Sequence, residues 1–181
     1  YKVFNKLTSY YAIIGLIMIM LLLQNVLKYR KWRLTIVRVG FYLLIAGFFV
    51  HSIGLAARWY ISDHAPWSNA YESVIYIAWA TLLAGFVFSN KSMMSMAATS
   101  IISALLLMVA ALNWLDPEIT NLVPVLDSYW LMIHVAIITA SYGFLALGAI
   151  LGFINLVLMI LQNKVNFKRI TNSISELTYI N

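Results

Sequence analysis

The sequence predicts an all-α integral membrane protein, with about five transmembrane helices and one short interfacial helix on the outer face. Three observations support this fold class. Hydrophobic residues make up 63% of the 181 residues and charged residues only 10%, whereas a soluble domain carries about 25% charged residues. Mean hydropathy is +0.88. The apolar residues form five long segments, and most of the charged residues lie between them. Such a chain needs the bilayer as its solvent.

Each of the five segments is long enough to cross ~30 Å of hydrocarbon at ~1.5 Å per residue. They cover about residues 10–27, 39–56, 71–88, 93–112 and 130–161. The fifth exceeds one bilayer thickness, so we expect it to tilt or protrude. We interpret residues 1–181 as a single transmembrane helical domain. Because the chain begins without Met and stops in a polar stretch, we expect it to be a fragment of a longer protein.

The basic residues predict the orientation of the helices. Nine of them fall on one side: Lys28, Arg30, Lys31, Arg33, Arg38, Lys91, Lys164, Lys168 and Arg169. The positive-inside rule makes that side cytoplasmic and places the N-terminus outside, although Lys2 and Lys6 depart from the rule. The other side holds two outer loops, at about residues 57–70 and 113–129, and most of their charged residues are acidic. Because the basic residues lie in short runs between apolar segments, the net charge of +6 does not indicate nucleic-acid binding.

Capping signals in the outer loops predict where helices begin. Asn69 has the position of an N-cap for the third segment, with Glu72 reaching back to its backbone N–H. The sequence Asp116-Pro117-Glu118 predicts the start of the short interfacial helix, which we expect to end before Pro124. Asp127-Ser128 then caps the fifth segment.

All three histidines fall on or near the outer side. His51 lies below the outer end of the second segment, His64 in the first outer loop, and His134 about one turn below the start of the fifth segment. A single membrane histidine can simply hydrogen-bond between helices. However, ionisable residues are expensive in a membrane and are candidates for function, and imidazole is a good ligand for iron. Both interpretations stay open for each histidine.

Aromatic residues also gather at the outer side. They are Trp59, Tyr60, Trp67, Tyr71, Trp114, Tyr129 and Trp130. An interfacial aromatic belt is one interpretation, and a shelf that holds a flat aromatic ligand by stacking is the other. Arg58, the single basic residue of the outer loops, either pairs with Asp63 or Glu72 or binds an anionic group of a ligand.

Several kinds of site are excluded by what the sequence lacks. The chain has no cysteine, so it contains no disulfide, no thiolate metal site, no cysteine nucleophile and no covalent haem attachment of its own. It has no phosphate-binding glycine loop, no nucleophile elbow and no HExxH pair.

Two stretches resemble patterns of a known family. Residues 58–60 (RWY) and 64–73 (HAPWSNAYES) are similar to GRxY…PxSNxYES, with Ala57 where the family usually has glycine. Residues 123–135 (VPVLDSYWLMIHV), with Ser141-Tyr142, are similar to VPxLxSxWLxxHV…SY. Both patterns belong to the CcsA-type cytochrome c synthases of system II cytochrome c biogenesis, which are sometimes fused to a CcsB-type half.

The resemblance implies that haem b is exported to the outer face and joined by thioether bonds to the CxxCH motif of apocytochrome c. It makes His134 an axial ligand of the haem iron. We expect the outer aromatic side chains and Arg58 to surround the haem, with His64 a secondary candidate and no catalytic residue assigned. The expected aromatic walls are Trp130, Trp67, Trp59 and Tyr71. In the family the second outer ligand and a tryptophan-rich motif follow later in the chain.

The resemblance also implies partners and a location. The partners would be haem, apocytochrome c, the rest of the same synthase including a CcsB-type half, and the lipid bilayer. We expect the cytoplasmic membrane of a bacterium, with the haem site facing the periplasm, and a plastid thylakoid as the alternative. Two other functions stay open. One is a b-type cytochrome in which His51 and His134 hold one haem for electron transfer, and the other is a non-haem transporter or structural subunit.

Overall fold

The computed structural model describes residues 1–27, 29–90, 92–112, 115–118 and 128–161. Within these residues the regular secondary structure is entirely helical: α1 (Lys2–Leu27), α2 (Lys31–Ser62), α3 (Ala70–Ser89), α4 (Met93–Ala111) and α5 (Tyr129–Leu161). All five helices are long and apolar enough to cross a membrane. The predicted all-α fold class with five helices of membrane-spanning length is confirmed.

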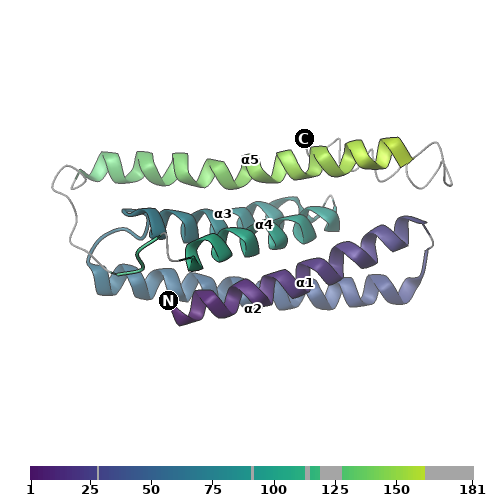
Figure 1. Cartoon of the computed structure of the whole chain (residues 1–181), viewed down its shortest axis with the longest axis horizontal. Coiled ribbons are helices and arrows are strands. Elements are labelled where there is room, and N and C mark those ends of the chain that lie inside the picture. The colour runs from purple at the N-terminus through teal and green to yellow at the C-terminus, as the bar shows by residue number, and fades with distance from the viewer. Residues whose placement is uncertain (28, 91, 113–114, 119–127, 162–181) are drawn as a thin grey trace.

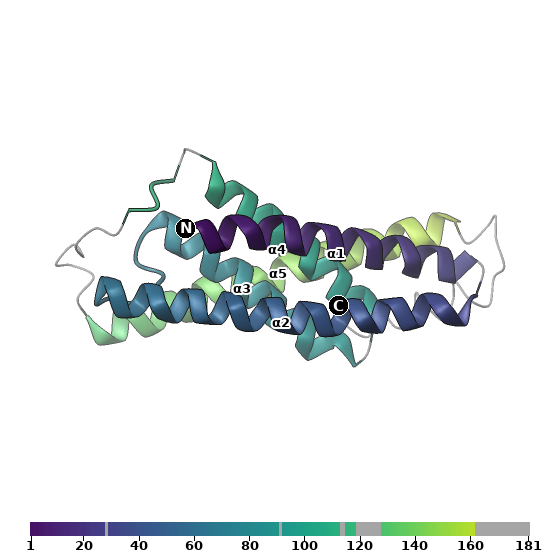
Figure 2. The same ribbon diagram turned by 90° about the horizontal axis from the view of Figure 1, so that it is seen from below.

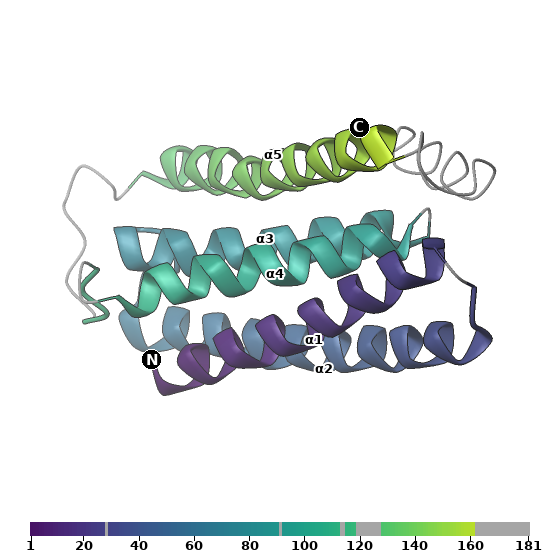
Figure 3. The same ribbon diagram turned by 45° about the vertical axis from the view of Figure 1, so that its right-hand side comes forward.

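The five helices form three layers (Figures 1 and 3). Helices α1 and α2 make one layer, α3 and α4 the middle layer, and α5 alone the third. Figure 2 shows α1 and α2 side by side across the rest of the bundle. The middle helices connect the layers, because α4 packs mainly on α3 and α1 whereas α5 packs mainly on α3. The last turn of α2 and the first turns of α3 and α5 lie at the same end of the bundle, which we call the outer end.

The centre of the bundle is built from small side chains on α4. Ser95, Thr99, Ser100 and Ser103 are fully buried. Their hydroxyl groups bond to backbone carbonyls, and Ser103 Oγ reaches across to Ala78 O of α3 at 2.8 Å. Small residues let membrane helices approach closely. A Cβ atom added at Gly85 of α3 would overlap Thr99 Oγ1, so this contact depends on both residues being small.

Helix α5 is attached to the bundle by one face. Its buried residues recur every four positions and then after seven: Thr139, Gly143, Leu147, Leu151 and Leu158. At Gly143 the helix comes so close to α3 that an added Cβ would lie 2.8 Å from the backbone nitrogen of Thr81. Much of the rest of α5 is exposed, including Trp130 and His134. This one-sided packing decides how the candidate site is arranged.

Two predicted segments are shorter than the helices that contain them. Helix α1 begins at Lys2 rather than near residue 10, and α2 covers 31–62 rather than 39–56. Charged and polar residues at these ends lower local hydropathy, yet long basic side chains can extend to the membrane surface while the backbone stays helical. The third, fourth and fifth predicted segments agree with α3, α4 and α5 within one residue at each end. Lys28, Lys91, Lys164, Lys168 and Arg169 lie outside the described residues, and the orientation stays a prediction.

The capping predictions are confirmed in part. The Glu72 N–H donates to Asn69 Oδ1 at 2.7 Å, so Asn69 is the N-cap of α3. Asp116 Oδ1 accepts from the Glu118 N–H at 2.9 Å, but the described residues 115–118 are not helical. The remainder of the predicted interfacial helix, with Pro124, and the Asp127 cap lie outside the described residues. The Ser128 carbonyl accepts the Met132 N–H at 3.0 Å, directly before α5 begins.

Candidate functional site

At the outer end, a sharp turn joins α2 to α3. Asp63 adopts a left-handed backbone conformation (φ 55°, ψ 18°) that ends α2, and its N–H donates to Trp59 O at 3.1 Å. Aspartate is among the few residues that occupy this region with little penalty. Because α2 continues to Ser62, the first outer loop is shorter than the predicted 57–70 and covers residues 63–69. The turn brings the last residues of α2 next to the first turn of α3.

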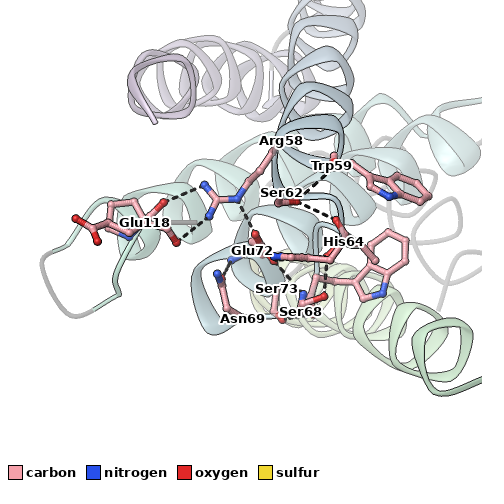
Figure 4. A network of polar contacts seen from close by, with 12 residues as sticks. Arg58, Trp59, Ser62, His64, Ser68, Asn69, Glu72, Ser73 and Glu118 are labelled. Atoms are coloured by element: carbon pink, nitrogen blue, oxygen red, sulfur yellow. Dashed lines mark hydrogen bonds and ion pairs between the residues drawn. The ribbon is translucent and has the colours of Figure 1, made fainter. Parts of the chain in front are cut away.

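A buried ion pair lies under this loop (Figure 4). Arg58 Nε donates to Glu72 Oε1 at 2.8 Å, and both side chains are almost completely buried. The other guanidinium nitrogens donate to the carbonyl oxygens of Pro117 (3.0 Å) and Glu118 (3.4 Å). The guanidinium carbon also lies 5.0 Å from the centre of the Tyr71 ring. Arg58 therefore pairs with Glu72, one of the two partners predicted for it, and also holds the chain beyond α4.

Glu72 has a different loop partner from the predicted one. Its Oε2 atom accepts the N–H of Ser68 at 3.1 Å, rather than the N–H of Asn69 that the capping-box spacing predicted. The reason is geometric, because Oε1 is held by Arg58 on the other side. One carboxylate therefore joins α2, α3 and the first outer loop.

His64 belongs to the same network. Its Nδ1 atom lies 3.2 Å from Ala65 O and 3.8 Å from Glu72 Oε2. A carbonyl oxygen can only accept, so this contact requires the hydrogen on Nδ1. The His64 carbonyl in turn accepts from Ser62 Oγ at 3.0 Å. The histidine side chain is only 9% exposed, so it lies inside the loop and has little surface for an external ligand.

Trp67 connects the first outer loop to α5. Its indole Nε1–H donates to the backbone oxygen of Met132 at 3.2 Å. Its ring lies edge-on to Trp59, with centroids 5.8 Å apart, and tilted against Tyr76 at 4.9 Å. Between Trp67, Ser68 and α5 remains a cavity of about 70 Å³, lined on the α5 side by Leu131, Met132 and Val135.

The aromatic contacts continue down the bundle from Trp67, a feature that sequence reasoning missed. Tyr76 stacks on Trp79, and Trp79 stacks on Phe48 of α2, with interplanar angles of 17° and 19°. Phe48 then meets Phe86 edge-on at 5.2 Å. Tyr76, Trp79 and Phe86 are spaced by three and seven residues, which places them on one face of α3. That spacing was the signal available in the sequence.

The outer aromatic residues occupy several places rather than one shelf. Trp59 is half-exposed and contacts Trp67, whereas Tyr71 is 1% exposed and covered by Arg58. Tyr129 and Trp130 form an exposed pair at the start of α5. Trp114 lies outside the described residues. The described residues among them share the outer end, but they face different sides of it.

His51 lies in the core between α1, α2 and α3. It is 0% exposed, and Nε2 donates to Ile75 O at 3.2 Å. The hydroxyl of Tyr11 approaches Nδ1 at 3.5 Å, and the ring of Phe4 meets the imidazole edge-on at 5.4 Å. Since α1 covers the remaining ring nitrogen, His51 has no face open to a metal ion in this structure.

His134 has the opposite environment. It is exposed on α5 and has no hydrogen-bond partner among the described residues. At 3.6 residues per turn it lies ~200° around the helix from Met132, which faces Trp67. It also lies one turn below Trp130, on the same side of the helix. His134 and Trp130 therefore face away from α3, and the structure does not place them against Trp67, Tyr71 or Arg58.

Comparison with known proteins gives consistent matches. The family model described as cytochrome C assembly protein matches residues 67–180. Protein NrfI of Wolinella succinogenes is 42% identical over 163 residues, which are 90% of this chain and 18% of NrfI. The cytochrome c biogenesis protein CcsA of Aethionema grandiflorum is 35% identical over 130 residues (66% of this chain, 40% of that protein), and that of Chlorella vulgaris is 39% identical over 113 residues (59% and 35%). The chain spans less than half the length of these relatives.

Proposed function

Because the chain belongs to the cytochrome c assembly protein family, as a multi-pass membrane protein of the CcsA/NrfI type, we propose that it forms part of a haem-binding site on the outer side of the membrane. There it would serve a cytochrome c synthase that exports haem and presents it to apocytochrome c. Haem is the substrate in this proposal. Its vinyl groups would form thioether bonds with the two cysteine thiols of a CxxCH motif.

The observation that carries the proposal is the open imidazole of His134. It is exposed at the outer end of α5, and no described residue hydrogen-bonds to it. A neutral imidazole with an open ring nitrogen is a good axial ligand for haem iron. Trp130, 78% exposed and one turn away on the same side, provides an aromatic surface for a flat macrocycle. His51 is buried, the His64 side chain is only 9% exposed, and both imidazoles bond to backbone oxygens, which favours His134 over both.

The positions of the other candidate residues give them indirect roles. Arg58 and Tyr71 are buried against Glu72 and each other, so they support the outer end rather than contact haem propionates or the porphyrin plane. Trp59 of α2 contacts Trp67, and Trp67 bonds to the start of α5, so the two tryptophans connect α2 to α5. The haem would lie on the side of α5 that faces away from α3. The remaining contacts, including a second axial ligand, would come from other parts of the same synthase, such as a CcsB-type half.

The b-type cytochrome alternative finds less support. It requires His51 and His134 to hold one haem, but Phe4 and Tyr11 of α1 cover His51 from one side and Ile75 bonds it from another. Helix α1 would have to separate from the bundle before iron could reach this imidazole. A non-haem transporter or structural subunit would leave the exposed His134 without a role. For location, the similarity to a bacterial NrfI favours a bacterial cytoplasmic membrane, with the site facing the periplasm.

The test is the substitution His134→Ala in the whole protein, with the haem that co-purifies measured by its Soret absorbance. We expect less bound haem and no production of holocytochrome c. Added imidazole should restore part of the haem binding, because it can occupy the vacated axial position. Thr139→Ser, a buried position five residues along α5, serves as the control for general damage to the helix. Normal haem content and normal cytochrome c maturation in the His134 variant would overturn the proposal.

A further inference from the structure

We propose that Trp67 and Arg58 are positioning residues that fix His134 from the two sides of the connection between α4 and α5. This inference rests on the proposed role of His134. It does not make either residue a haem contact. The two side chains hold backbone atoms of the chain at Pro117–Glu118, in the first part of the connection, and at Met132, just after it.

The bond from Trp67 acts closest to His134. Met132 O, which accepts the indole N–H at 3.2 Å, lies in the first turn of α5, two residues before His134. The first turn of a helix lacks part of its backbone bonding and tends to fray. A side chain that holds a carbonyl there limits how far the turn can move away from α3. The direction of the His134 imidazole follows the direction of that turn.

The indole of Trp67 is itself held firmly. Its ring lies between Trp59 and Tyr76, its backbone N–H donates to Ala65 O at 2.8 Å, and its carbonyl accepts from Ser73 Oγ at 3.1 Å. A donor fixed on both its ring and its backbone can determine where its acceptor lies.

Arg58 holds the other side of the connection. Glu72 fixes the guanidinium through Nε, and the two remaining nitrogens reach two successive carbonyls, those of Pro117 and Glu118. A planar guanidinium suits this task because its donors have fixed directions, whereas a lysine ammonium is a single flexible donor group. The ion pair therefore fixes the chain just after α4, as Trp67 fixes it at the start of α5.

The experiment uses Trp67→Phe in the whole protein, which keeps an aromatic ring and removes the indole N–H. The matched control is Trp79→Phe, which removes the indole bond to Ser52 Oγ (2.8 Å) without touching α5. Hydrogen–deuterium exchange is followed at the amides from Met132 onward, because Met132 is the first residue of α5 whose N–H has a backbone acceptor, Ser128 O. Haem is followed by its content and its reduction potential. A net hydrogen bond of ordinary strength predicts about fivefold faster exchange in Trp67→Phe, with haem retained at a shifted potential. The control should change neither quantity.

Each outcome decides the proposal. Unchanged exchange at the start of α5 would overturn the anchoring role of Trp67. Faster exchange with an unchanged potential would show that Trp67 holds α5 but does not position the haem ligand. Arg58→Lys, which keeps the charge beside Glu72, tests the bonds to Pro117 and Glu118 and should also shift the reduction potential of the haem. An unchanged reduction potential would remove Arg58 from the proposal. If His134→Ala keeps its haem, the proposed function fails instead, and the exchange data still report on the anchor.

Discussion

The Nε atom of Arg58 lies 2.8 Å from Oε1 of Glu72, and the two side chains are 8% and 0% exposed. Each charged group is thereby shielded from water, and its charge is balanced by that of the other. An exposed ion pair contributes little to stability, but breaking a buried pair leaves an uncompensated charge, which costs about 3–5 kcal/mol. Loss of either partner alone should therefore destabilise the outer end strongly.

The first prediction follows from this pair. Arg58→Met should lower the unfolding free energy by about 3–5 kcal/mol, because Glu72 is left buried without a partner. Thermal unfolding in detergent or nanodiscs measures the loss. The double variant Arg58→Met/Glu72→Met should recover most of it, since both charges are gone. Similar stability of the single and double variants would contradict the interpretation. Asp63→Asn, at an exposed position, should change little.

The second prediction concerns the cap of α3. Asn69→Ala should cost about 1 kcal/mol, because Asn69 Oδ1 accepts the Glu72 N–H at 2.7 Å. Asn69→Ser should retain most of the stability, since serine is also a good N-cap. Equal losses in the two variants would mean that Asn69 acts through something other than its side-chain oxygen.

The third prediction tests the contact of α5 with α3. Gly143→Leu should destabilise the protein by at least about 1–3 kcal/mol, the usual cost of overpacking, because even a Cβ would lie 2.8 Å from Thr81 N. Ala149→Leu, at an exposed position on the same helix, is the control and should be tolerated. If both variants unfold at the same temperature, α5 does not approach α3 at Gly143.

The fourth prediction separates a structural histidine from a ligand. His51→Phe removes the bond from Nε2 to Ile75 O and leaves a buried carbonyl without that donor, at a cost of about 1–3 kcal/mol. The amount of co-purified haem should not change, measured by Soret absorbance under conditions in which the variant is folded. Loss of haem from a folded His51→Phe variant would instead support the b-type cytochrome.

The fifth prediction concerns orientation. The chain has no cysteine, so single cysteines can be introduced for labelling with a membrane-impermeant maleimide. Tyr60→Cys, at a position that is 90% exposed at the outer end, should be labelled from outside the cell. Trp32→Cys, at the opposite end of α2 and 55% exposed, should be labelled only after the membrane is opened. The reverse pattern would contradict the positive-inside assignment.

The sequence predicted the helices well because their signal is strong. Five apolar segments appear as five helices, and the N-cap Asn69 lies where its spacing indicated. The predicted positions of the helix ends were less accurate where charged residues continue the helix, as at Lys2 and Lys31. Glu72 bonds the N–H of Ser68, one residue from the expected partner, because the pull of Arg58 on its other oxygen cannot be read from local spacing.

The candidate site was harder to predict because sequence gives the depth of a residue but not its direction. His51 and His134 are at similar predicted depths, yet His51 faces α1 and α3 whereas His134 faces away from α3. Tyr71 and Trp59 were expected on one shelf and lie in different environments. Direction depends on which face of each helix is packed, and that is decided by the neighbouring helices.

The residues that make contact at the outer end are synthesised at different times. The two partners are separated along the chain by 14 residues for Arg58–Glu72, 59 for Arg58–Pro117 and 65 for Trp67–Met132. At about 5–20 residues per second of synthesis, those separations correspond to roughly 1–3, 3–12 and 3–13 s. Arg58 and Glu72 are therefore both synthesised before α4. When α5 emerges from the ribosome, the ion pair that holds one side of its connection has already had time to form.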